Sequence, residues 1–79
     1  MDIETVSKRT GLVKSLADKH RVTQEEADTL LFLAGRSEIA EVACRMIDRG
    51  FPYWRVRRAL ITGARTESEF KLWLETHHG

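Results

Sequence analysis

Apolar residues recur three or four positions apart along most of the chain, which is the spacing of one face of an α-helix. Five stretches show this pattern, and they predict helices over residues 3–20, 24–34, 38–49, 53–62 and 67–77. No stretch alternates apolar and polar residues as a half-buried β-strand does. The pattern therefore predicts an all-α fold, a compact bundle of four to five short helices.

Residues that favour helix ends separate these stretches. Thr23 and Thr66 each stand three positions before a glutamate, which is the capping-box pattern of a helix start. Ser37 is the expected N-cap of the third helix, and Pro52 suits the first position of the fourth. The glycines expected to end the second, third and fourth helices are Gly35, Gly50 and Gly63.

The first stretch contains a glycine near its middle. Gly11 lowers the stability of a helix by about 1 kcal/mol relative to alanine. We therefore expect the ordered helix to start at Thr10, and residues 1–9 to be loosely ordered.

The inward faces of the five helices define the expected core. Their apolar stripes are Ile3, Val6, Val13, Leu16 and Ala17; Ala27, Leu30, Leu31 and Ala34; Ile39, Val42, Ala43, Met46 and Ile47; Tyr53, Val56, Ala59 and Leu60; and Phe70, Trp73 and Leu74. The core also has room for Phe32 and Phe51. A chain of 79 residues, 42% of them hydrophobic, is expected to form one domain over residues 1–79.

A core of this size supplies only about 3–5 kcal/mol of net stability. Cys44 is the only cysteine, so no disulfide within the chain can add to that stability. Self-association is a further source of buried surface, and we weigh a homodimer equally with a monomer.

The sequence shows no signal for export or membrane insertion. No apolar run reaches the roughly 20 residues that span a bilayer. The acidic N-terminus lacks the apolar stretch of a signal peptide. A lone thiol also fits a reducing compartment, so we expect a cytoplasmic protein.

The positive charge is concentrated in one segment. Residues 1–41 hold six basic and eight acidic side chains, and residues 66–79 hold one basic and three acidic. Residues 42–65 carry six arginines and one acid, Asp48, for a net charge of +5. Arginine offers a rigid planar fork of donors that suits phosphates, carboxylates and base edges. This segment indicates a surface for an anionic partner; salt bridges to neighbouring helices are the simpler alternative.

The predicted helix over residues 53–62 carries the clearest candidate surface. At about 100° per residue, Arg55, Arg58 and Thr62 form a row opposite its inward face. Trp54 borders this row, and tryptophan and arginine dominate protein-binding hot spots. The candidate residues for nucleic-acid or partner binding are Trp54, Arg55, Arg57, Arg58, Thr62 and Arg65.

The segment from Ile39 to Thr62 combines a helix, a glycine-containing turn and a basic helix. It resembles the helix-turn-helix of bacterial DNA-binding regulators, with the motif at residues 38–62. The resemblance implies that the helix at about 53–62 enters the major groove of duplex DNA. After the turn, the residues that fit the motif are Phe51, Val56 and Ala59. Before the turn, the residues that depart from it are Arg45, Met46 and Arg49.

Two functions follow from this candidate surface. The preferred one is a small DNA-binding transcriptional regulator, in which Arg55 and Arg58 contact phosphates or guanine edges. The alternative is a protein-binding inhibitor or anti-activator, of the kind that phages and plasmids encode. Such a protein would dock its arginine and tryptophan patch on an acidic protein surface.

No residue set in the sequence suggests catalysis. Cys44 has no histidine near it in sequence to act as a base and is expected beside the core. The adjacent His77 and His78 point to different sides of a helix, so a shared metal is not expected. His20 is expected at the exposed or C-capping end of the first helix. We therefore expect a binding protein rather than an enzyme, with no cofactor and no metal.

Overall fold

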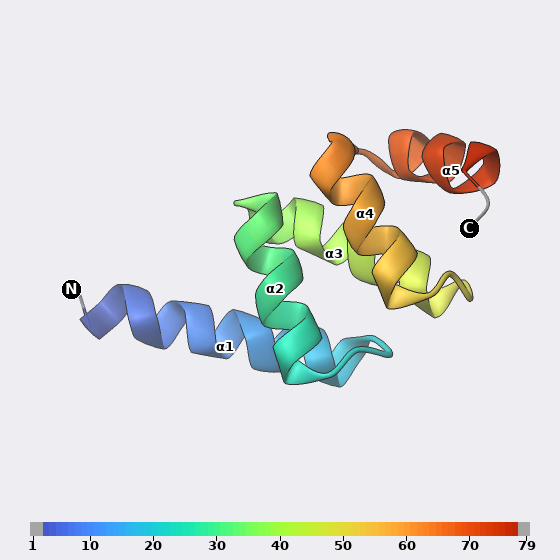
Figure 1. Cartoon of the computed structure of the whole chain (residues 1–79). Coiled ribbons are helices and arrows are strands. Elements are labelled where there is room, and N and C mark those ends of the chain that lie inside the picture. Colours follow the sequence, from blue (N-terminus) through green and yellow to red (C-terminus); the bar gives the residue numbers. More distant parts are fainter. Residues whose placement is uncertain (1–2, 78–79) are drawn as a thin grey trace.

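The computed structural model describes residues 3–77 of the chain, with side chains from Arg9 onward. Over that range it is helical, with five α-helices and no β-strand, which confirms the all-α fold. The helices shown in Figure 1 are α1 (Ile3–Lys19), α2 (Gln24–Ala34), α3 (Ser37–Asp48), α4 (Tyr53–Thr62) and α5 (Glu67–Thr76).

Helices α2 and α3 form the centre of the molecule. Helix α2 packs against α1, α3 and α4, while α3 contacts all four other helices. Among the described residues, helix α1 packs against α2 and α3 alone, and Figure 1 shows its N-terminal end (blue) extending beyond the rest of the bundle. Helices α4 and α5 pack against each other at the opposite end of the molecule.

Helix α1 begins earlier than the sequence suggested. It starts at Ile3 rather than Thr10 and continues through Gly11. Within the segment expected to be loosely ordered, Arg9 forms a contact with α2. The guanidinium of Arg9 donates to a carboxylate oxygen of Asp28 on α2, from Nε at 3.0 Å and from Nη2 at 2.7 Å. Residues 1 and 2 of the segment expected to be loosely ordered lie outside the described residues.

Both predicted capping boxes form. The hydroxyl of Thr23 accepts from the amide of Glu26 at 3.1 Å, and the Glu26 carboxylate accepts from the amide of Thr23 at 2.9 Å. Thr66 and Glu69 repeat the arrangement at 3.2 and 3.0 Å. The three predicted glycines follow their helices with a positive φ, at 75°, 107° and 118° for Gly35, Gly50 and Gly63.

The capping positions predicted for Ser37 and Pro52 are each wrong by one residue. Ser37 is the first residue of α3 rather than its N-cap, because Arg36 is extended and its carbonyl already accepts from the amide of Ala40. Pro52 is the N-cap of α4 rather than its first residue. Its ψ of 148° is extended, and its carbonyl accepts the first helical hydrogen bonds.

The core agrees with the predicted stripes of α2, α4 and α5, apart from two partly buried aromatic residues, Tyr53 and Trp73. The inward face of α3 is rotated from its prediction. Ala40 and Cys44 are fully buried, whereas Ile39, Val42 and Ile47 are only partly covered. Ala43 and Met46 of the predicted stripe are fully buried.

Phe32 contradicts the expected core. Its side chain is 72% exposed on α2, and the guanidinium of Arg9 lies 5.9 Å from its ring centroid. The inward face of α2 is already filled by smaller apolar residues, and Phe32 lies outside that stripe. Phe51 is partly buried and Phe70 fully buried.

A histidine–aspartate pair joins the end of α1 to the end of α3. His20 is mostly buried rather than exposed, with its side chain 9% accessible. Its Nδ1 lies 2.5 Å from one carboxylate oxygen of Asp48, and the amide of Arg21 donates to the other at 2.8 Å. The hydrogen bond with His20, followed by that from Arg21, holds the pKa of Asp48 below its usual value of 3.8.

The lowered pKa of Asp48 predicts a loss of stability in acid. A carboxyl group whose pKa is lower in the folded state stabilises the fold above its unfolded pKa, and this contribution is lost as the pH falls through the folded pKa. We expect Asp48→Asn to lower the free energy of unfolding at about pH 5 and to differ much less from the natural chain at about pH 2. Urea unfolding at the two pH values measures the difference, and an equal effect at both would contradict the pairing.

Cys44 is expected to be unreactive in the folded protein. Burial raises the pKa of its thiol to about 12, and the charges of Asp48, Glu41 and Glu26 add to the effect. Because the thiolate is the reactive form, we expect Ellman's reagent to label folded protein more than about a hundredfold more slowly than urea-unfolded protein at pH 8. Similar rates in both conditions would show that Cys44 is accessible.

Candidate binding surface

A tight turn positions α4 on the bundle. Gly50, with φ at 107°, allows its own amide to donate to Ile47 at 3.0 Å and the amide of Phe51 to donate to Met46 at 3.2 Å. These two bonds form a Schellman motif that ends α3. The turn of four residues, 49–52, then leads directly into α4.

Helix α4 is buried along one face only. Val56, Ala59 and Leu60 are at most 1% exposed, in a helix that packs on α2, α3 and α5. The opposite face, which we call the α4 surface, consists of Trp54, Arg57, Arg58 and Ile61. Their spacing of three, four and seven positions places them side by side on the helix.

The α4 surface combines large apolar side chains with unpaired positive charge. Trp54 is 49% exposed and Ile61 is 61% exposed. Both are lining residues of a shallow depression that also contains Arg57, Arg58 and Thr62. Helix α4 contains no acidic residue. Within the described part of the chain, neither arginine forms a salt bridge, although the guanidinium of Arg57 lies 5.7 Å from the Tyr53 ring centroid.

Arg55 does not belong to the α4 surface, contrary to the expectation from the helical row. Its guanidinium is partly buried against α5, where Nη2 donates to the carbonyls of Leu74 and, at 2.8 Å, His77. The guanidinium carbon lies 5.7 Å from the centroid of the Phe51 ring. The last carbonyls of a helix have no intrahelical donor, so α5 supplies strong acceptors at this position. Arg55 therefore caps α5 instead of facing solvent.

Arg65 is also engaged within the fold. Its Nη1 donates to the carbonyls of Leu60 and Ala64, each at 2.8 Å, and so caps the end of α4. The Thr62 hydroxyl donates to the carbonyls of Ala59 at 2.8 Å and Arg58 at 3.1 Å. Of the six predicted residues, Trp54, Arg57 and Arg58 share one exposed face, and Thr62 lies at its C-terminal end.

Ile61 is a residue of this surface that the sequence analysis did not select. The available signal was its position seven residues after Trp54 and three after Arg58, outside the inward stripe of the helix. An isolated exposed apolar residue is ordinary, so the signal is weak by itself. Because Ile61 lies beside Trp54, the two residues together form an exposed apolar area on α4.

The charge of the basic segment is partly neutralised by neighbouring residues. Arg49 pairs with Glu67 of α5 at 2.5 Å. This contact follows the simpler interpretation of the arginine-rich segment, in which its charges pair with adjacent helices. Within the described residues the other five arginines of the segment form no salt bridge, and of these Arg57 and Arg58 lie on the exposed face of α4.

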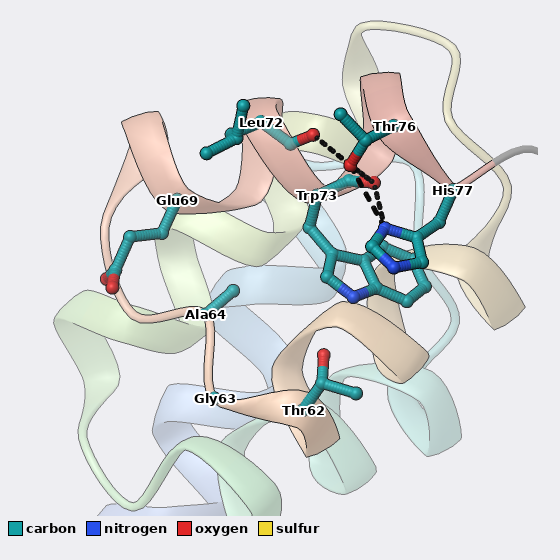
Figure 2. Close-up of a pocket in the computed structure, with 8 residues that line it drawn as sticks. All are labelled: Thr62, Gly63, Ala64, Glu69, Leu72, Trp73, Thr76 and His77. Atoms are coloured by element: carbon teal, nitrogen blue, oxygen red, sulfur yellow. Dashed lines mark hydrogen bonds between the residues drawn. The ribbon is translucent and has the colours of Figure 1, made fainter.

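A second depression lies beside the first, between the end of α4 and α5. Figure 2 shows that its wall is formed by Trp73 and His77, whose rings stack with centroids 4.3 Å apart and an angle of 7° between planes. Its volume, about 310 Å³, is at the lower end of the range for small-molecule sites. The lining residues are Thr62, Gly63, Ala64, Glu69, Leu72, Trp73, Thr76 and His77.

Over the described residues, no three or more His, Cys, Asp or Glu side chains gather in a way that could hold a metal ion. None of the described helices is both long enough and apolar enough to cross a membrane.

Comparison with known proteins gives no relative to draw on. No protein-family model, curated protein or solved structure matches the chain. The function must therefore be inferred from the surfaces of this molecule.

Proposed function

We propose that this chain is a protein-binding module that docks the α4 surface on an acidic surface of a partner protein. One observation carries the proposal: Trp54 and Ile61 are both exposed on a helix face whose two arginines have no acidic partner among the described residues. Exposed aromatic and arginine side chains together are typical of the residues that dominate protein interfaces. It corresponds to the alternative function expected from the sequence, a protein that docks its arginine and tryptophan patch on an acidic surface.

The position of the arginines favours a protein over DNA. DNA-binding surfaces are more polar and more positively charged than protein interfaces, because phosphates provide much of the affinity. Two of the arginines that would have contacted DNA, Arg55 and Arg65, donate to backbone carbonyls of the fold. The α4 surface retains two arginines beside two large apolar residues. This composition supports burial against an apolar patch with an acidic rim.

DNA binding remains the second candidate because of the turn before α4. The turn of four residues with a glycine resembles the connection of a helix-turn-helix. Pro52 accepts from the amides of Arg55 and Val56, so the earlier amides of α4 point out of the helix start, where an anion is favoured. For this candidate, Arg57 and Arg58 would contact DNA, and the affinity would fall steeply with salt.

Affinity capture from the source cells, with and without nuclease, distinguishes the two candidates. The natural chain is the bait, compared with Arg57→Glu/Arg58→Glu and with Arg36→Glu/Arg45→Glu as a control of equal charge change. We expect one protein in stoichiometric amount that survives nuclease, is lost from the first variant and remains with the control. Nucleic acid as the captured species would support DNA binding instead. Equal capture by both variants would contradict a role for the α4 surface.

A further inference from the structure

We propose that the docking surface continues from α4 onto α5, and that it receives an acidic amphipathic helix of the partner. In this arrangement the acidic side chains of the partner lie over Arg57 and Arg58. One of its apolar side chains enters the depression beside Trp73. This inference rests on the proposed function and identifies the kind of segment that the surface binds.

Thr62 connects the two depressions. It lines both the depression on the α4 surface and the one between α4 and α5. Its hydroxyl already donates to the carbonyl of Ala59, so Thr62 needs no polar group from a partner. Gly63, the next residue, lines the depression between α4 and α5 and carries no side chain (Figure 2). A bound segment can therefore contact both without crossing a charged barrier.

The side of the surface on α5 is largely apolar. Leu72 is 65% exposed at the border of the depression, and Trp73 is partly buried within it. His77 extends the aromatic wall by stacking on Trp73, while its Nδ1 stays within 3.0 Å of the Trp73 carbonyl. The volume of about 310 Å³ has room for a large apolar side chain. An apolar anchor is the chemistry that this depression accommodates.

The distribution of charge indicates the acidic character of the partner and its orientation. Arg57 and Arg58 supply positive charge at the α4 end, with no acidic residue on that helix. The one acid that lines the α5 depression is Glu69, whose carboxylate accepts from the amides of Arg65 and Thr66. These bonds hold the pKa of Glu69 below its usual value and keep its carboxylate at the helix start. Acidic residues of the partner are therefore expected over α4, and its apolar anchor over α5.

A helix is the secondary structure that best matches this layout. Trp54 and Ile61 are two helical turns apart, which corresponds to about 10 Å along α4. A partner helix presents apolar side chains at comparable intervals along one face, with acidic side chains at the border. It can therefore contact both apolar residues of α4 and still reach the depression on α5.

The two tryptophans provide a separate signal for each half of the surface, because Trp54 lies on α4 and Trp73 on α5. The probe is a synthetic amphipathic peptide with leucines on one face and glutamates at the border. A peptide with lysine in place of each glutamate is its control. The indole N–H signals of the full ¹⁵N-labelled chain are followed during titration and assigned with Trp54→Phe and Trp73→Phe. We expect the acidic peptide to shift both signals and the lysine peptide to shift neither.

Leu72→Glu tests the α5 half with little risk to the fold, because Leu72 is mostly exposed. We expect this variant to bind the acidic peptide about tenfold more weakly and to lose the shift of Trp73. Ser68→Glu, with the same charge change on α5 outside the depression, should bind like the natural chain. Circular dichroism confirms that both variants are folded.

A shift of Trp54 alone would overturn the extension to α5 and leave the proposed function intact. No shift of either signal with the acidic peptide, while the captured partner protein still shifts both, would overturn the acidic helix as the occupant. Shifts with a DNA duplex but not with either peptide would overturn both this inference and the proposed function.

Discussion

Replacing Arg55 with alanine is expected to lower the free energy of unfolding by about 2 kcal/mol, the cost of removing charge-assisted hydrogen bonds from a partly buried site. Arg55 joins α4 to the last carbonyls of α5 and packs over Phe51. A core of this size supplies only about 3–5 kcal/mol in total, so the loss would be a large share of the stability. Urea unfolding followed by circular dichroism measures it.

Arg57→Ala is the matched control for Arg55→Ala. Arg57 is an exposed arginine of the same helix without a hydrogen bond to another helix in the described residues. We expect its substitution to change the stability by no more than about 0.5 kcal/mol. If the two alanine variants were equally stable, the capping role of Arg55 would be wrong.

The second large effect is expected at Trp54. Trp54→Ala should weaken binding of the captured partner protein by about thirtyfold or more, which corresponds to the roughly 2 kcal/mol of a hot-spot residue. Because Trp54 is 49% exposed in the free chain, its removal should leave the stability nearly unchanged. Isothermal titration calorimetry measures the affinity, and urea unfolding measures the stability of the same preparation.

Phe32→Ala is the matched control for Trp54→Ala. Phe32 is an even more exposed aromatic residue, at 72%, and lies on α2 outside the proposed surface. We expect it to bind the partner within about threefold of the natural chain. An equal loss of affinity in the two variants would mean that exposed aromatic residues in general, rather than the α4 surface, account for binding.

The sequence was sufficient to predict helix starts and ends, because these depend on residues close together in the chain. The hydrogen bonds of a capping box join residues three positions apart, so Thr23 and Thr66 mark helix starts without knowledge of the fold. The same holds for Gly35, Gly50 and Gly63, whose positive φ values are needed at the ends of their own helices. The all-α architecture follows from these signals and from the helical period of the apolar residues.

The sequence was insufficient to predict the position of a side chain that contacts residues far away in the chain. Arg55 was assigned to the outer face because a helical projection contains no information about α5, whose carbonyls lie 19 and 22 residues away. His20 was placed at an exposed helix end, yet it meets Asp48 across 28 residues. Both cases are polar contacts between helices, and only the packed structure brings the partners together.

The candidate site was therefore predicted in part. Trp54, Arg57 and Arg58 were selected correctly as exposed residues of one helix, and the structure adds Ile61 beside them. Because Arg55 does not lie on this face, the face is a mixed apolar and basic surface and not the arginine row suited to phosphates that the sequence predicted. That change is the reason we prefer a protein partner to DNA.

If the partner binds as proposed, it covers the α4 surface and leaves α1 and α2 exposed. Solvent paramagnetic relaxation by a soluble gadolinium chelate tests it directly, because the exposed apolar side chains Leu12, Phe32 and Ile61 lie on three different helices. With the captured partner bound, we predict that Ile61 loses most of its relaxation enhancement while Leu12 and Phe32 keep theirs. Protection of Leu12 and Phe32, with Ile61 still accessible to the chelate, would show that the partner binds α1 and α2 instead of the α4 surface.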